Sequence, residues 1–308
     1  MKNKAKRSND NMSKEINKKK SNKSIKILLI LSLIFVIIGT IILLYPNISN
    51  YFANKNHTEL IRTYNKVIKE SKKEDLEKEM RKAISYNENL SGEPVHDPFV
   101  KGSGYALPKN YLEVLNVTDN DIMGYIKIPK ISVFLPIYHG TSEEVLEKGI
   151  GHIQTTSLPI GGNSTHCALT GHTGLPNAEL FTRIDELIVG DIFYIYTLDK
   201  ELAYKVYETK VILPNQIDEL KITSNDDLVT LVTCTPYGIN SHRLLVKARR
   251  TEYDENVLNE SNNNGNHNMK NTKKSCYLTS MQICIFMIVI VLIVIFILFS
   301  LLKRKKDE

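Results

Sequence analysis

Two long apolar runs, one near each end, constrain most strongly how this chain can fold. Residues 27–45 (ILLILSLIFVIIGTIILLY) form a run of 19 uncharged residues, and residues 281–302 (MQICIFMIVIVLIVIFILFSLL) form a run of 22. At about 1.5 Å per residue, helices of these lengths reach roughly 28 and 33 Å, enough to cross a hydrocarbon core of about 30 Å. We therefore predict transmembrane helices at 27–45 and 277–302.

A cleaved signal peptide is the alternative interpretation of the first run. The run is long for the apolar region of a signal peptide, and the sequence that follows it, YPNISNYF, has no A-x-A-like cleavage site. Both features favour an uncleaved membrane anchor.

Charge predicts how the chain is oriented. Residues 1–26 hold ten Lys or Arg and two acidic residues, a net charge of +8, and the tail 303–308 (KRKKDE) carries +2. The positive-inside rule then places both tails in the cytoplasm and the stretch between the spans outside the cell. Nucleic-acid binding is an alternative for the basic N-terminal tail, but topology and attraction to anionic lipid already account for its charge. We predict no nucleic-acid partner.

The segments that flank the main domain have distinct patterns. Residues 46–90 form a predicted extracellular helical segment, in which apolar side chains fall on one stripe between Lys/Glu-rich faces. The stripe does not sustain heptads, so we expect a helical hairpin laid on the main domain rather than a coiled coil. Residues 91–105 (SGEPVHDPFVKGSGY) form a loop rich in Gly and Pro. Residues 252–276, rich in Asn and Lys, form a flexible linker.

Residues 106–251 have the pattern of a mainly β domain. Short runs of β-branched and aromatic residues alternate with turn signals, and two helical turns, EEVLEKGIG and AELFTRIDEL, interrupt them. The predicted strands are GYIKIPKI, VFLPIYHG, THCALTGH, DIFYIYTL, LAYKVYETKVI, DLVTLVTC and RLLVKARR. About eight short strands in a domain of this size predict a closed or nearly closed β-barrel.

The chain has four cysteines, of which Cys167 and Cys234 lie in the exported part. The other two, Cys276 and Cys284, border or lie in the second apolar run. Two cysteines are too few for a disulfide framework in a domain that can build its own core. The sequence does not decide whether these two form a single disulfide with each other. Cys167 falls in the middle of a predicted strand and is expected to be a small buried core residue.

Cys234 ends the β-branched run TLVTC, and a thiol there needs a nearby cation or imidazole to act as a nucleophile. Arg243 follows nine positions later. His242 adjoins Arg243, so on a strand the two side chains point to opposite faces. His172 ends the run CALTGH between Gly171 and Gly174, where a turn can present a side chain into a groove. A structural role for this histidine is the alternative.

The TLVTC run ending at Cys234, Arg243 opening the next strand, and LTGHTG around His172 together resemble the sortase family of cysteine transpeptidases, over about residues 123–250. The resemblance implies an eight-stranded β-barrel. It also implies that Cys234 attacks the Thr–Gly carbonyl of an LPXTG-like sorting signal and forms a thioester. His172 would protonate the leaving amine and deprotonate the incoming one, and Arg243 would hold the substrate and the oxyanion.

Two features resemble the class C, pilus-polymerising sortases: the second membrane span, and the sequence DPF at Asp97–Phe99, which resembles a lid motif of that class. In a lid, Asp97 would meet Arg243 and Phe99 would cover Cys234. An ordinary Asp-Pro turn followed by a core Phe is the alternative. The resemblance implies a Gram-positive type envelope and, as partners, LPXTG-bearing pilins or surface proteins.

Three other functions remain open: a housekeeping sortase whose acceptor is peptidoglycan, a hydrolase that releases LPXTG proteins, and a non-catalytic two-span receptor or adhesin. Some sortases bind calcium beside the groove, but no matching acidic cluster is evident in the sequence, so we expect no metal and no cofactor.

Overall fold

The computed structural model describes residues 2–90, 110–118 and 120–253. The chain divides into two compact units, one made of residues 1–45 with 270–308 and the other of residues 46–269. The predicted lid residues, the Asn/Lys-rich linker and the second predicted span lie outside the described residues.

The N-terminal apolar run belongs to helix α1, Lys2–Glu70. Within the described residues, this is the one helix long and apolar enough to cross a membrane, and most of the apolar side chains described in its run 27–45 are exposed. The prediction of a helical first span is therefore met in length and composition. The helix also continues through Pro46, so the tail, the span and the first part of the following segment form one element.

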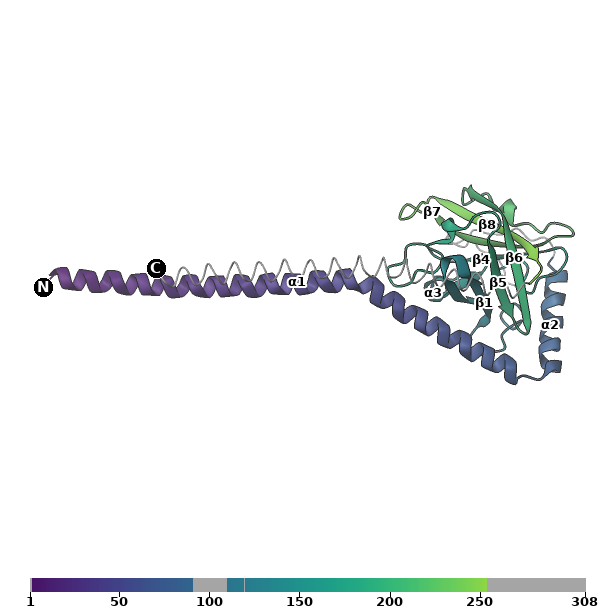
Figure 1. Ribbon diagram of the computed structural model, residues 1–308, viewed down its shortest axis with the longest axis horizontal. Helices are drawn as coiled ribbons and strands as arrows, with labels where there is room; N and C mark the ends of the chain where they lie inside the picture. The colour runs from purple at the N-terminus through teal and green to yellow at the C-terminus, as the bar shows by residue number, and fades with distance from the viewer. Residues whose placement is uncertain (1, 91–109, 119, 254–308) are drawn as a thin grey trace. The chain divides into compact units, whose positions relative to one another are not determined.

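Eight strands form a closed barrel in the order β1-β2-β3-β4-β7-β8-β6-β5, which confirms the predicted fold (Figure 1). The pairs β2–β3 and β4–β7 are parallel, and the other six pairs are antiparallel. The strands are β1 Ile122–Ile128, β2 Val133–Tyr138, β3 Ile150–His152, β4 Thr165–Thr170, β5 Ile192–Thr197, β6 Lys200–Ile212, β7 Asp227–Thr235 and β8 His242–Thr251.

Two local predictions were wrong in detail. The segment EEVLEKGIG holds the short helix α3, Glu143–Lys148, but its end belongs to strand β3. Three residues are too few to show a period of two, and β3 forms because β2 and β4 flank it. AELFTRIDEL contains only one turn of 3-10 helix, η2, Ile184–Glu186. The remaining short helices are η1, Pro129–Ile131, and η3, Ile217–Leu220.

A helical hairpin lies on the barrel, formed by the end of α1 and by α2, Lys73–Glu88. Ile61 and Tyr64 of α1 are buried in a cluster with residues of β1 and β2, and the apolar stripe of α2 joins the main core. Asn87 binds the backbone of Leu158 in both directions: its Oδ1 accepts from the Leu158 N–H at 2.7 Å, and its Nδ2 donates to the carbonyl at 3.5 Å. Side-chain and backbone contacts together therefore fix the hairpin.

His57 makes a further contact between the hairpin and the barrel domain. Its ring is buried, and Nε2 lies 2.8 Å from the Lys148 carbonyl, to which it donates. Burial lowers the pKa of His57, and the bond to Lys148 opposes that shift. His57 therefore helps to attach α1 to the end of α3.

The barrel has two apolar surfaces, and strand alternation separates them. On β7, Val229 and Leu231 belong to the main core, together with residues from all the other strands. Val232 belongs to a smaller cluster with Leu245 of β8 and Leu220 of η3, among others. Successive side chains of a strand point to opposite faces, so Val232 and Leu245 lie on the outer face of the barrel wall.

Candidate active site

Cys234 is the last residue but one of β7, where the strand reaches the end of the barrel wall. Two residues separate it from Val232, so its side chain lies on the same outer face as Val232. Cys234 is buried, with 8% of its surface exposed. Its sulfur is therefore on the side of the wall away from the main core.

Arg243 lies directly opposite Cys234 in the register between β7 and β8. Residues opposite each other on antiparallel strands project from the same face, so the guanidinium and the thiol share the outer surface of the wall. Arg243 is also buried, and its Nη1 donates to the carbonyls of Asn240 at 3.1 Å and His242 at 3.0 Å. These two bonds hold one terminal nitrogen of the guanidinium group beside the strand ends.

His172 follows the end of β4, the other neighbour of β7. The parallel register pairs Thr170 with Val232, so His172 lies two residues beyond this pair, as Cys234 does on β7. The connecting residue, Gly171, is bonded to β7 at two points: its N–H donates to the Val232 carbonyl at 3.2 Å, and its carbonyl accepts from Thr233 Oγ1 at 2.7 Å. The barrel therefore brings together the ends of β4 and β7 that carry His172 and Cys234.

The imidazole of His172 is half-buried. Burial lowers its pKa, and the carboxylates of Glu143 and Glu147 on α3 oppose the shift. A lowered pKa keeps the ring mainly neutral near pH 7, in the form that can accept a proton.

The other histidines of the barrel have structural partners. In His152, Nε2 lies 2.9 Å from the Ser157 carbonyl and Nδ1 lies 2.9 Å from the Tyr111 hydroxyl. In His166, Nδ1 lies 2.8 Å from the Lys221 carbonyl. Both rings are buried, and burial lowers both pKa values. His242 is on β8, opposite Thr235.

Cys167 and Cys234 form no disulfide with each other. Cys167 belongs to the main core, as expected, and burial raises the pKa of its thiol well above the ordinary value. It pairs with Val229 on β7, which is on the face opposite to Cys234. The two thiols therefore occupy different environments.

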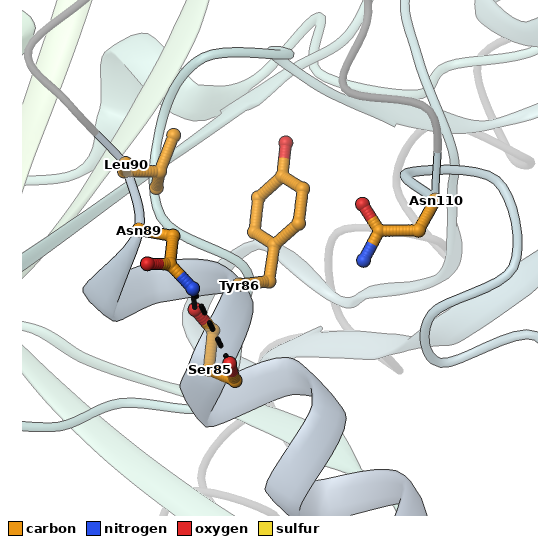
Figure 2. Close-up of a pocket in the computed structure, with 5 residues that line it drawn as sticks. All are labelled: Ser85, Tyr86, Asn89, Leu90 and Asn110. Carbon is orange, nitrogen blue, oxygen red and sulfur yellow. Dashed lines mark hydrogen bonds between the residues drawn. The ribbon is translucent and has the colours of Figure 1, made fainter.

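A cavity of about 140 Å³ lies beside α2. Its lining does not include Cys234, Arg243 or His172. Figure 2 shows its lining residues, with the Tyr86 ring between Asn89 and Leu90 on one side and Asn110 on the other. The Tyr86 hydroxyl is buried and has no hydrogen-bond partner among the described residues, and burial raises its pKa to about 12. This cavity is distinct from the strand ends that carry Cys234 and Arg243.

Comparison with known proteins supplies the family. A family model described as "Sortase domain" matches residues 126–251. The crystal structure of sortase C-1 from Actinomyces oris is 44% identical, with a TM-score of 0.56, over 58% of this chain and 99% of that one. The chain belongs to the sortase family.

Two further relatives agree with this assignment. A sortase C structure from Streptococcus pneumoniae is 40% identical, with a TM-score of 0.59, and the match covers 63% of this chain and 97% of that one. Sortase A of Bacillus anthracis is 26% identical over 70% of this chain and 91% of its own length. The protein is therefore a cysteine transpeptidase whose structural relatives include class C sortases.

Proposed function

We propose that this sortase joins pilin subunits, with Cys234 as nucleophile, His172 as proton carrier and Arg243 as the group that holds substrate and oxyanion. The observation that carries the proposal is the register pair of Cys234 with Arg243, next to the strand end that leads to His172. Similarity to class C structures supports the pilus type; one relative, from group B Streptococcus at 39% identity, is described as pilus-related.

In the proposed reaction, His172 takes the proton of the Cys234 thiol, and the sulfur attacks the Thr–Gly carbonyl of an LPXTG-like signal. The tetrahedral oxyanion is stabilised by the Arg243 guanidinium, which is always charged. The C–N bond then breaks, His172 gives a proton to the leaving glycine amine, and a thioester remains. A lysine amine of the next pilin attacks the thioester and loses a proton to His172. The C–S bond breaks as the isopeptide bond forms, and His172 returns the proton to the Cys234 sulfur.

The test uses the full-length enzyme in detergent with an LPXTG-type peptide, and it follows the covalent thioester by mass spectrometry. Cys234→Ala is expected to abolish the thioester, and His172→Ala to be nearly as severe because both steps need a proton carrier. Cys167→Ala is the matched control, since it removes the other described thiol and should still acylate. A thioester in Cys234→Ala would overturn the assignment.

The acceptor is a separate question, which product analysis can decide. A pilin peptide with a lysine, a cross-bridge amine and water are offered to the acyl-enzyme in parallel. Isopeptide product with the lysine supports the pilus type. Preference for the cross-bridge amine would indicate a housekeeping sortase, and hydrolysis despite added amine would indicate a releasing enzyme. Failure of Cys234 to react at all with a thiol-reactive sorting-peptide analogue would favour a receptor or adhesin.

We also propose that both apolar runs span the membrane, with both termini cytoplasmic and the catalytic barrel outside. External protease should then cleave residues 46–280 after wall removal and spare both tails. A mature N-terminus near Tyr51 would show instead that the first run is a cleaved signal peptide.

The lid is a further part of the proposal and rests on the sequence DPF. If Asp97 pairs with Arg243 and Phe99 covers Cys234, a reagent reaches the thiol only during the fraction of time when the loop is open. An exposed ion pair contributes up to about 1 kcal/mol and a buried aromatic ring roughly 1.5–3 kcal/mol, so the open fraction is on the order of a few per cent after loop ordering is included. Asp97→Ala with Phe99→Ala should speed alkylation of Cys234 by roughly ten-fold or more. Equal rates would mean that DPF is only a turn.

A further inference from the structure

Tyr237 lies three residues after Cys234, in the loop between β7 and β8, and it was given no role by the sequence analysis. Its side chain is 68% exposed. One side of its ring lies against Gly174, in the loop that follows β4. A Cβ atom added to Gly174 would be only 3.0 Å from Cε2 of Tyr237 and 3.2 Å from Cζ. Gly174 also has a φ of +78°, which favours glycine.

The contact joins two loops that carry proposed catalytic groups, and each loop is anchored by its own hydrogen bonds. In the loop after β4, the His172 carbonyl accepts from the Phe181 N–H at 3.1 Å, and the Gly174 N–H donates to Thr182 Oγ1 at 3.0 Å. His172 and Gly174 are therefore two residues apart in one loop and are held by the adjacent residues Phe181 and Thr182.

The loop after Cys234 is anchored in a similar way. The N–H groups of Ile239 and Asn240 both donate to the Pro236 carbonyl, at 3.0 and 2.9 Å. The Asn240 carbonyl in turn accepts from Arg243 Nη1. The Tyr237 ring thus projects from a compact turn between Cys234 and Arg243, and it reaches across to the other loop.

We propose that Tyr237 is a positioning residue, whose ring holds the loop carrying His172 against the turn that follows Cys234 and so sets the separation of imidazole and thiol. This inference rests on the proposed roles of Cys234 and His172. Such a contact matters for rate because a misplacement of about 1 Å between reacting groups can cost on the order of 10²-fold.

The contact contributes little to folding. Two-thirds of the Tyr237 surface remains in water, and substitutions at exposed positions usually change stability little. Loss of the ring should therefore lower kcat while the melting temperature stays nearly unchanged. This separation is the property that identifies a positioning residue.

The test measures kcat and KM for the transpeptidation of an LPXTG-type peptide by full-length enzyme in detergent, together with the melting temperature. Tyr237→Ala is expected to lower kcat by about 10- to 100-fold, with KM and melting temperature nearly unchanged. Tyr237→Phe keeps the ring carbons that face Gly174 and should retain wild-type kcat within about two-fold. Ile239→Ala is the matched control: it removes another exposed apolar side chain from the same turn, 72% exposed, and should leave kcat unchanged.

A double-mutant cycle tests whether Tyr237 acts through Gly174. Gly174→Ala forces a Cβ against the ring and strains the backbone, so it should lower kcat by itself. Because the two residues are in contact, the loss of kcat in the double variant should be smaller than the product of the two single losses. If the loss of kcat in the double variant equals the product of the two single losses, Tyr237 does not act through its contact with Gly174.

Three other outcomes would overturn the inference: an unchanged kcat in Tyr237→Ala, a raised KM at constant kcat, which would make Tyr237 a substrate contact, or an equal loss of kcat in Ile239→Ala. Failure of the underlying assignment is recognised separately, because Cys234→Ala or His172→Ala would then remain active. If both of these are inactive while Tyr237→Ala is normal, only the positioning role is wrong.

Discussion

The Tyr64 hydroxyl is one of the groups that attach α1 to the barrel, and replacing Tyr64 by Phe should show how much it contributes. The Tyr64 side chain is buried, and its hydroxyl donates to the Met123 carbonyl at 3.1 Å and accepts from the Leu198 N–H at 2.7 Å. Met123 lies where the β1–β2 register shifts, and Leu198 lies in the turn between β5 and β6. Both backbone groups are therefore at interruptions of the strand ladders.

Removing the hydroxyl leaves two buried backbone groups without this partner. Each unsatisfied group lowers the free energy of unfolding by about 1–3 kcal/mol. Allowing for some relaxation, we expect Tyr64→Phe to lower the free energy of unfolding by about 2–4 kcal/mol. For a domain of 150–250 residues, this corresponds to a fall in melting temperature of roughly 4–16 °C. The measurement is urea and thermal unfolding of full-length protein in detergent, followed by near-ultraviolet circular dichroism of the tyrosines.

Tyr51→Phe is the control on the same helix. Tyr51 is exposed, so loss of its hydroxyl should change the free energy of unfolding by no more than about 0.5 kcal/mol. The reasoning is refuted if Tyr64→Phe unfolds like wild type while Tyr64→Ala is strongly destabilised. That pattern would mean that ring packing, rather than the two hydrogen bonds, attaches the helix.

Three further predictions concern the barrel. Burial lowers the pKa of His152 to about 4, so on acidification the unfolded chain takes up a proton before the folded one. The free energy of unfolding should therefore be highest above pH 6.5 and should fall by up to about 3 kcal/mol between pH 6.5 and 4. Urea titrations across this range should show a weaker dependence on pH in His152→Gln. Gly124→Ala places a Cβ 2.2 Å from the Tyr196 carbonyl oxygen and should cost about 1–3 kcal/mol or more, seen as a lower melting temperature. Cys167 is buried with a raised pKa, so in Cys234→Ala peptide mapping should find Cys167 alkylated only after unfolding.

Local sequence patterns predict most of the barrel because strand alternation and turn residues act over a few positions. They also place Cys234 at a strand end and Arg243 at a strand start, and a short connection between antiparallel strands favours a register in which these two residues meet. His172 is different. Its approach to Cys234 depends on the parallel pairing of β4 with β7, between residues 62 positions apart. No local pattern contains that pairing, so the sequence could indicate it only through a family resemblance.

Charged residues show a second reason why sequence reasoning falls short. Lys247 lies in the strand segment RLLVKARR, where a lysine suggests an exposed position, yet its side chain is only 9% exposed. Its ammonium group pairs with Glu208 on β6, at 3.3 Å, and with Glu219 on η3. Hydrogen bonds from Lys210 and Lys247 depress the pKa of Glu219 to about 2. Burial of a charge depends on such distant partners, which alternation along one strand does not specify.

The alternation of β7 explains how the strand can serve both folding and the proposed catalytic role of Cys234. Val229 and Leu231 fill the main core, so a thiol at position 233 would point inward, where Thr233 instead donates to the Gly171 carbonyl and joins β7 to the end of β4. Position 234 has the opposite parity, and its opposite partner on β8 is Arg243. A thiol at this one position therefore shares a face with the guanidinium while the residue before it binds the segment that leads to His172. The same pairings that close the barrel thus assemble the proposed site.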